Sequence, residues 1–324
     1  MDAREFTIVL PVYYNEESLE PAFRDLRSAL ETASASGWKG HLLYVDDGSG
    51  DNSLEVLRRI QARGEVPVTV VKLSRNFGQV MAIRAGIEHA GTPVTIVMSA
   101  DGQEPASLIG QMLDAYRNDG AEVVVCTRSG REESNYRKWT SKMFYGLMRK
   151  LCFREMPIGG FDCFLLGSKA QKAFLQESER QPFLQGQILG LGFKRVFIPY
   201  VRLAREFGES HWTFGKKLAY FFDGLMNYSF APIRFVSFVG IALAVLGLLY
   251  AGVVFFAKIL VGNPVQGWTP LMIAILVLGG AQMLTLGIFG EYLWRILVQA
   301  QRRAPYIVES VSPPEPPDGE SSSN

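Results

Sequence analysis

Two uncharged apolar stretches near the C-terminus constrain this chain more than any other feature of its sequence. Phe235–Ala257 runs for 23 residues without a charge, and Leu271–Gly290 runs for 20. At roughly 1.5 Å of rise per residue, helices of these lengths reach about 34 and 30 Å, which matches a hydrocarbon core of about 30 Å. Burial inside a soluble core is the weaker alternative, because the two stretches are adjacent. The sequence therefore predicts two transmembrane helices, at about 235–257 and 271–293.

The basic residues near this pair of stretches lie mostly outside it, with only one between the two stretches. The connecting loop carries Lys258 alone. The basic residues on the outer sides are Lys216, Lys217, Arg234, Arg295, Arg302 and Arg303. By the positive-inside rule, both termini and everything before the first stretch are predicted to be cytoplasmic. The start MDAREFTIVLPV agrees with this, because it lacks the basic region and the long apolar run of a signal peptide.

The composition fits a soluble domain with a small membrane part. The 33 Lys plus Arg against 32 Asp plus Glu give a net charge of +1, which argues against binding to nucleic acid through bulk charge. A charged fraction of 20% is too high for a polytopic transporter, while 48% hydrophobic residues is high for a wholly soluble enzyme. The three cysteines show no CxxC or His-paired spacing, so neither a disulfide scaffold nor a zinc module is predicted.

Strand-like and helix-like segments alternate over residues 6–126. The β-rich runs are Phe6–Leu10, Leu42–Val45, Val68–Leu73, Val94–Met98 and Val123–Cys126. The runs with helical spacing are Leu19–Leu30, Leu54–Ile60, Val80–His89 and Leu108–Tyr116. This alternation predicts an α/β fold with a mostly parallel sheet covered on both faces. Such sheets bind ligands at the carboxyl ends of their strands.

Two further segments, 139–152 and 213–231, have apolar stripes with basic margins. This pattern is typical of helices in the membrane interface, although an ordinary core-packing helix is an equal alternative for 139–152. The tail from Ser310 is rich in proline and serine, which predicts disorder. The predicted parts are an α/β domain at 1–212, an interfacial helix at 213–231, the two spans within 232–298 and a mostly disordered cytoplasmic tail at 299–324.

Polar residues follow each of the five predicted strands. The segments are Pro11–Glu16, Asp46–Ser49, Ser74–Gly78 and Ser99–Glu104, and the fifth strand is followed by Arg128 and Arg131. Carboxylates accept hydrogen bonds from ribose hydroxyls or hold a hard cation, and arginine matches phosphate oxygens. Each segment alone is a weak signal, whereas their order on consecutive strands is specific. Neither GxGxxG nor GxxxxGK[ST] occurs, so a dinucleotide enzyme or a P-loop NTPase has no support.

The chain resembles the family 2 glycosyltransferases with a GT-A fold. The resemblance rests on PVYYNEE, VDDGS, LSRNFGQ, SADGQEP, GFDCFLL and REFGESHWTF, then two spans, FGEYLWRI and YIVES, and it covers about residues 6–309. The RxFGxS pattern with paired spans narrows it to the membrane-anchored polyprenyl-phosphate glycosyltransferases. That group includes bactoprenol glucosyltransferase, undecaprenyl-phosphate formamidoarabinose transferase and dolichol-phosphate mannose synthase. A processive polysaccharide synthase is disfavoured, because QxxRW is absent and two spans are too few for a channel.

The resemblance implies inverting transfer of a sugar from a nucleotide-sugar, with UDP as the expected nucleotide, to a polyprenyl (undecaprenyl) phosphate. The reaction is expected at the cytoplasmic face of a bacterial inner membrane. Membrane lipid is an expected partner and nucleic acid is not. Assembly of several copies through the spans is compatible with the sequence. The residues implied for the nucleotide-sugar are Pro11, Tyr13, Tyr14, Glu16, Asp46, Asp47 and Gln103, with either tyrosine stacking on the base. Those implied for the diphosphate or the acceptor phosphate are Arg128, Arg131, Arg205 and Ser210.

The resemblance also assigns catalytic carboxylates, with one departure. Asp101 matches the second acid of the metal-binding DxD motif, but Ser99 occupies the place of the first. A cation shared with a diphosphate needs few protein ligands, so a retained but weaker Mg²⁺ or Mn²⁺ site is predicted at Asp101. Asp162 matches a proposed catalytic base. A phosphate monoester with its second pKa near about 6 is already mostly a dianion, so Asp162 is expected to act chiefly through positioning.

Two alternatives remain open on the sequence alone. One is transfer to another lipid or to a glycan. The other is a catalytically degenerate, nucleotide-binding member of the family, which Ser99 motivates.

Overall fold

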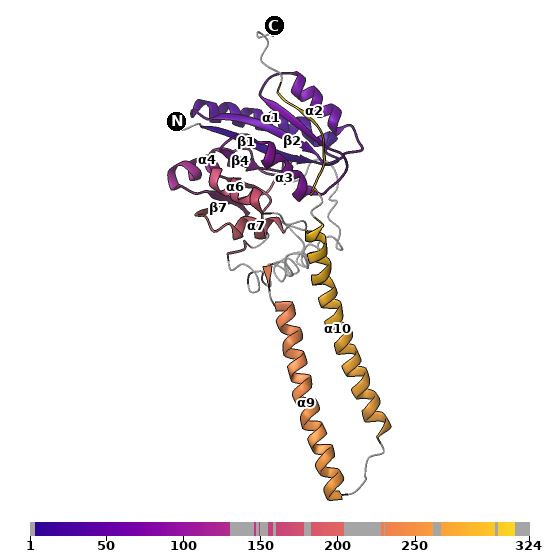
Figure 1. The fold of residues 1–324 in the computed structure, drawn as a ribbon. Coiled ribbons are helices and arrows are strands. Elements are labelled where there is room, and N and C mark those ends of the chain that lie inside the picture. Colours follow the sequence, from indigo (N-terminus) through magenta and orange to yellow (C-terminus); the bar gives the residue numbers. More distant parts are fainter. Residues whose placement is uncertain are drawn as a thin grey trace. The chain divides into compact units, whose positions relative to one another are not determined.

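The computed structural model divides the chain into two compact units, which are described separately below (Figure 1). One contains Met1–Phe221 together with Arg303–Asn324, and the other contains Phe222–Arg302. The described residues are 4–129, 146, 149, 155–157, 160–177, 183–203, 228–229, 231–261, 267–301 and 304–314. The two predicted interfacial helices fall almost entirely outside these residues, as do Arg131, Arg205 and Ser210.

The first unit is built on a mixed sheet, which confirms the predicted α/β fold class. Its strands are β1 (Glu5–Val12), β2 (Lys39–Asp46), β3 (Val68–Leu73), β4 (Val94–Val97), β5 (Val123–Arg128), β6 (Phe164–Leu166), β7 (Arg195–Tyr200) and β8 (Val308–Ser312). Their order is β7-β5-β6-β4-β1-β2-β3-β8, an 8-stranded sheet. The pairs β4–β1, β1–β2, β2–β3 and β5–β7 are parallel, whereas β6 and β8 are antiparallel to their neighbours. The five strands predicted from the sequence are β1 to β5.

Helices cover both faces of this sheet (Figure 1). The helices are α1 (Glu16–Ala35), α2 (Ser53–Ala62), α3 (Gln79–His89), α4 (Leu108–Asp119), α6 (Ser168–Gln176) and α7 (Leu184–Gly190). On one face α1 packs against α2 and α4, and on the other α3 packs against α6. Because both faces are covered, the central strands are continuous apolar runs rather than alternating ones.

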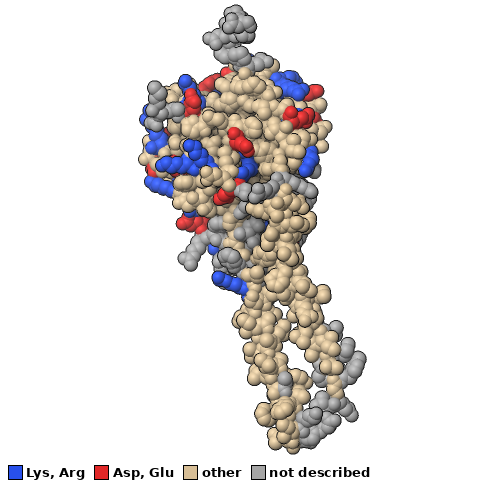
Figure 2. Space-filling view, viewed as in Figure 1, with Lys and Arg blue, Asp and Glu red and all other residues tan. Residues whose placement is uncertain are grey.

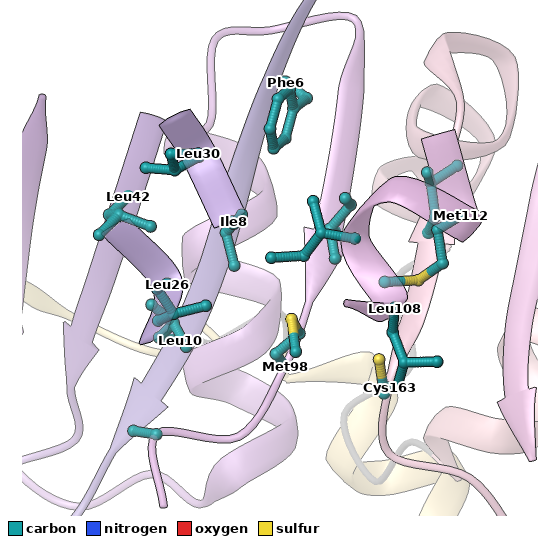
Figure 3. Close-up of a cluster of buried hydrophobic side chains, with 14 of the residues drawn as sticks. Phe6, Ile8, Leu10, Leu26, Leu30, Leu42, Met98, Leu108, Met112 and Cys163 are labelled. Atoms are coloured by element: carbon teal, nitrogen blue, oxygen red, sulfur yellow. The ribbon is translucent and has the colours of Figure 1, made fainter. Parts of the chain in front are cut away.

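The core forms where β1 meets α1 (Figure 3). Ile8 and Leu10 of β1 are 0% exposed, and Leu26 and Leu30 of α1 are each 5% exposed. On the opposite face α3 approaches β1 through Gly86, where a Cβ atom would lie 2.2 Å from Val9 Cγ1. Only glycine permits that approach. The carboxyl end of β1, and the polar loop after it, are thereby held from both sides.

The last strand of the sheet comes from beyond the second apolar helix. β8 pairs antiparallel with β3, and the backbone N–H of Ser74 donates to the Ile307 carbonyl over 3.0 Å. The Gln61 side chain donates to the carbonyls of Ser312 and Pro313 over 3.0 and 2.8 Å. The sequence predicts disorder from Ser310, and Ser310–Ser312 instead belong to the strand. Their order comes from pairing with a distant edge strand, which local composition does not reveal.

The second unit consists of two long apolar helices, α9 (Ala231–Val261) and α10 (Trp268–Ala300). Their apolar segments, Ile233–Phe256 and Ile273–Ala300, have mean hydropathies of 2.5 and 2.0 and are long enough to cross a membrane. Charged side chains gather over the unit that contains the sheet, whereas few are seen along α9 and α10 (Figure 2). The predicted helices are confirmed, and both are candidate membrane spans.

Candidate functional site

The loops after β1, β2 and β3 interlock at the carboxyl edge of the sheet. The Asp47 backbone N–H donates to the Val12 carbonyl over 2.9 Å, and the Asp47 carboxylate accepts from Phe77 N and Gly78 N over 2.7 and 2.9 Å. Gly48 has a φ of 69°, and a Cβ atom there would lie 2.6 Å from the carbonyl carbon of Arg75. The VDDGS turn therefore requires glycine at this position. One carboxylate thus joins two loops that are far apart in the sequence.

Asp47 is held inside the protein, and its protonation reflects this. The residue is 3% exposed, and burial raises its pKa to about 6, although the two backbone hydrogen bonds oppose the rise. A carboxylate with both oxygens used by backbone donors is primarily a support for the loops. Its direct contact with a nucleotide stays a prediction.

Asp46, one residue earlier, keeps an unused acceptor. Its side chain is 0% exposed, Oδ1 accepts from Ser49 N over 3.2 Å, and Oδ2 has no hydrogen-bond partner among the described residues. Burial raises the pKa of Asp46, while the hydrogen bonds from Ser49 lower it. An unpaired buried carboxylate oxygen is costly, so this atom is a candidate acceptor for a ligand hydroxyl or N–H group.

The two tyrosines after β1 have different surroundings. Tyr14 has a φ of 55°, which is rare for a residue other than glycine, and its N–H donates to Ser49 Oγ over 3.2 Å. Its hydroxyl would lie 2.6 Å from a Cβ atom at Gly50, so Tyr14 rests on the turn after β2. Tyr13 is 37% exposed, with its ring centroid 4.6 Å from that of Tyr14. The strained backbone at Tyr14 therefore sets how both rings are presented.

Pro11 and Glu16 frame this aromatic pair. Pro11 lies in β1 opposite Val45 of β2. The Glu16 carboxylate accepts from Asn52 N and Asn52 Nδ2 over 3.2 and 2.8 Å, which ties α1 to the start of α2. Glu16 is thus engaged with the neighbouring loop, and its contact with a nucleotide stays a prediction.

The loop after β4 gathers a serine and two carboxylates. Ser99 Oγ lies 2.6 Å from Asp101 Oδ1 and also contacts Glu104 Oε2, and Gln103 N donates to Asp101 Oδ1 over 3.2 Å. Gln103 is 8% exposed, and its carbonyl accepts from Leu203 N over 3.0 Å. Burial raises the pKa of Glu104, although the hydrogen bond from Ser99 lowers it. Glu104 lies in the polar segment expected after the fourth strand, but it was given no role from the sequence, because its burial and its contact with Ser99 cannot be read from the residue order.

Arg128 and Asp162 form an ion pair at the same edge. Arg128 is the last residue of β5, and Asp162 lies two residues before β6 begins. The backbone N–H of Cys126 donates to the Cys163 carbonyl over 3.0 Å, which aligns these two segments. The Arg128 side chain is 15% exposed and that of Asp162 is 41% exposed. Burial raises the pKa of the adjacent Tyr200, as do the charges of nearby carboxylates such as Glu104. An arginine held in this way presents its remaining donors in a fixed direction.

Together these groups can bind a phosphorylated, hydroxyl-rich ligand. Asp46 offers an acceptor, Arg128 offers donors for phosphate oxygens, and Asp101 offers a carboxylate for a hard cation. Among the described residues, no group of three His, Cys, Asp or Glu side chains is arranged to hold a metal ion by itself. A cation at this edge therefore needs oxygens from the ligand as well.

Comparisons with known proteins agree on one family. The family model described as "Glycosyl transferase family 2" matches residues 7–173. The uncharacterized glycosyltransferase YkcC of Bacillus subtilis is 33% identical over 306 residues, which cover 94% of this chain and 93% of that protein. The bactoprenol glucosyl transferase of Shigella phage SfV is 26% identical, over 94% of this chain and 98% of that protein. The glucosyl-3-phosphoglycerate synthase of Mycobacterium tuberculosis, solved with Mn²⁺, UDP-glucose and phosphoglyceric acid, is 16% identical with a TM-score of 0.44, over 67% of this chain and 76% of that one.

Proposed function

The chain belongs to glycosyl transferase family 2, and from this premise we propose that it moves one monosaccharide, with inversion, from a UDP-sugar to a polyprenyl phosphate. The observation that carries the proposal is the extent of the likeness to proteins named bactoprenol glucosyl transferases. These match 94–95% of this chain, a share that includes the sheet and both apolar helices. The likeness therefore covers the parts that a sugar nucleotide and a lipid carrier would each need.

The donor would bind across the ends of β1, β2 and β4. The unpaired Oδ2 of Asp46 accepts from the nucleoside, and one of the two exposed tyrosine rings, Tyr13 or Tyr14, stacks on the base. Stacking on an aromatic ring is sequence-tolerant, since every base has a π-face. The chemistry of this edge thus recognises a nucleotide more strongly than it selects one sugar.

A divalent cation fits the end of β4 in chemical terms. Asp101 supplies a carboxylate, Ser99 lies beside it, and the diphosphate of the donor would provide the remaining oxygens, the usual arrangement for Mg²⁺. When bound, the cation would neutralise charge on the diphosphate. Few protein ligands are needed in such a shared site, so the serine at position 99 is compatible with it.

The acceptor phosphate would meet the donor beside the Arg128–Asp162 pair. A phosphate monoester is mostly a dianion at neutral pH, so its approach to an anionic donor is the larger barrier, and arginine lowers it. Asp162 fixes Arg128 and thereby orients this positive charge. Arg131, Arg205 and Ser210 are further proposed phosphate contacts, carried over from the family pattern.

The path of the chain supports two crossings with the catalytic unit in the cytoplasm. The chain leaves this unit before α9 and returns to it as β8, which pairs with β3. The segment before α9 and the segment after α10 therefore belong to the same domain, which lies on one side of the membrane. The chain must then cross the membrane an even number of times. The surplus of basic residues on those ends favours the cytoplasmic side of a bacterial inner membrane.

The proposal is tested by measuring nucleotide release from UDP- and GDP-sugars by the detergent-purified full chain. The reactions contain Mn²⁺ and either undecaprenyl phosphate, undecaprenol or no lipid. We expect release with one donor that depends on the lipid phosphate, because the phosphate is the nucleophile. Equal release with undecaprenol would overturn the acceptor class. If folded protein that binds UDP releases no nucleotide from any donor, the result would favour the non-catalytic alternative that Ser99 motivates.

A further inference from the structure

The Ser99 hydroxyl lies between two carboxylates at the end of β4. Its Oγ atom is 2.6 Å from Asp101 Oδ1 and also contacts Glu104 Oε2. The Ser99 backbone N–H donates to the same Glu104 oxygen over 3.0 Å. A serine hydroxyl carries one proton, so it can donate to only one of the two carboxylates at a time. Asp101 and Glu104 therefore compete for a single donor.

Glu104 is buried with too few hydrogen-bond donors for a role in packing alone. It is 5% exposed, and its Oε1 atom has no hydrogen-bond partner among the described residues. An unpaired buried polar oxygen costs about 1–3 kcal/mol, and more when the group is charged. An apolar side chain of similar volume would avoid that cost. The acid at this position therefore needs a reason beyond the filling of space.

We propose that Glu104 is a positioning residue for the cation and the diphosphate of the donor, and that it acts through Ser99. When Glu104 accepts the Ser99 hydroxyl, Asp101 is released from that hydrogen bond and its Oδ1 atom turns to the cation. The bond from Ser99 N keeps the serine in place during this exchange. The inference rests on the proposed function, because it requires a nucleotide-sugar site that uses a divalent cation.

The first test is the binding of Mn²⁺ to the detergent-purified full chain in the presence of UDP, measured by calorimetry. Glu104→Gln keeps the shape of the side chain and weakens its acceptor. Removal of a group that orients a metal ligand typically costs 10–100-fold in metal affinity, and we expect a loss in this range. Binding of UDP without metal should stay within about twofold, because Glu104 contacts Ser99 at the end of β4 and the acceptor proposed for the nucleoside is Asp46 at the end of β2.

The second test asks whether Glu104 acts through Ser99. Ser99→Ala removes the shared hydroxyl, so Asp101 has no hydrogen bond from this side chain to give up, and Mn²⁺ affinity should stay within about twofold of that of the unchanged chain. In the double variant, Ser99→Ala should remove most of the loss caused by Glu104→Gln, because residues that act as one unit are not additive. Full additivity would contradict a route through Ser99.

A third variant moves the carboxylate rather than deleting it. Ser99→Asp combined with Glu104→Gln keeps the number of acids and places one beside Asp101, where it can reach the cation directly. We expect Mn²⁺ affinity at least as high as in the unchanged chain. The matched control is Glu122→Gln, a glutamate that accepts from Lys169 N and Ala170 N over 3.1 and 3.4 Å in another part of the fold. This control should leave Mn²⁺ affinity unchanged.

The outcomes separate the inference from the proposed function. If the unchanged chain binds neither UDP nor Mn²⁺, the proposed function fails. If it binds both, and Glu104→Gln either leaves Mn²⁺ affinity unchanged or lowers it equally with and without the Ser99 hydroxyl, only the inference is overturned. If Glu104→Gln abolishes UDP binding without metal, Glu104 is a structural residue and the inference is again overturned. Should Glu104→Gln fail to fold, Ser99→Ala still decides, since a loss of Mn²⁺ affinity of about 10-fold or more in that variant would show that the hydroxyl does not compete for Asp101 and would overturn the inference.

Discussion

The parallel centre of the sheet and its two antiparallel strands contribute to the site in different ways. In the centre, β1 to β4 follow one another through helices, and their end loops are tied by carboxylates that accept backbone N–H groups, as Asp47 does. The antiparallel strands bring in distant segments: β6 carries Asp162 to Arg128, and β8 closes the free edge of β3. The parallel centre thus holds its end loops together at the edge proposed for ligand binding, and the inserted strand brings the Arg128–Asp162 ion pair to the same edge.

The largest expected effect is that of Asp162→Asn, which should lower the rate of the reaction without weakening the binding of UDP. The change removes the charge that fixes Arg128, and we expect kcat to fall by about 10²–10³-fold, as when an oriented charge is lost near the reacting groups. Affinity for UDP should change by less than about twofold, since the loops of the parallel centre are untouched. Steady-state kinetics with saturating donor and calorimetry with UDP measure the two quantities.

Two comparisons control this result. Arg128→Lys combined with Asp162→Asn should cost little more than the worse single change, because the pair acts as a unit. A shift of the acid limb of the pH–rate profile in Asp162→Asn would instead show that Asp162 takes up a proton in the reaction, contrary to a positioning role.

Loss of β8 should have the next largest effect, on stability. A chain ending after Tyr306 loses the pairing with β3 and leaves Gln61 without its two carbonyl partners beyond that point. At about 1 kcal/mol for each net hydrogen bond, the two Gln61 bonds and the bond from Ser74 N to the Ile307 carbonyl alone amount to about 3 kcal/mol, so we expect a loss of at least this size, or about 10 °C in unfolding temperature. The matched control ends after Pro314 and keeps the strand. Equal unfolding temperatures for the two truncations would show that β8 does not stabilise the sheet.

The same contrast explains what the sequence could predict. β1 to β5 and the helices α1 to α4 have local periodicity, and their polar ends follow from the rule that parallel sheets bind ligands at carboxyl edges. Three strands were not predicted from the sequence, namely β6, of three residues, β7 and β8, because each pairs with a strand that is distant in the chain. The unpaired oxygens of Asp46 and Glu104 were also invisible, since a sequence shows acids but not which of their atoms are buried without a donor.

Asp46→Asn tests the parallel centre of the sheet, where we expect an effect on the binding of UDP rather than on the rate. The amide weakens the buried acceptor at the end of β2, and hydrogen bonds to charged groups are worth about 1.5–3 kcal/mol, so UDP affinity should fall by about 10–100-fold. With saturating donor, kcat should change by only a few-fold, the reverse of the pattern for Asp162→Asn. The measurements are calorimetry with UDP and initial rates over a range of donor concentrations. A loss of kcat with intact UDP affinity would place Asp46 in the chemistry rather than in binding.

The smallest effect concerns Asp47, which joins the loops of the parallel centre. Its pKa is raised from 3.8 to about 6 in the folded protein, chiefly by burial, so the folded state binds a proton that the unfolded chain lacks in this window. The free energy of unfolding should therefore rise as the pH falls from about 6 to about 4, by about 1 kcal/mol for each unit, and Asp47→Asn should lack this rise. The measurement is the difference in unfolding temperature between the two proteins at pH 7 and at pH 5, which should widen in favour of the unchanged chain. If this difference in unfolding temperature narrows instead, the hydrogen bonds from Phe77 N and Gly78 N stabilise the ionised carboxylate by more than burial destabilises it. The negative charge of Asp47 would then stabilise the loops.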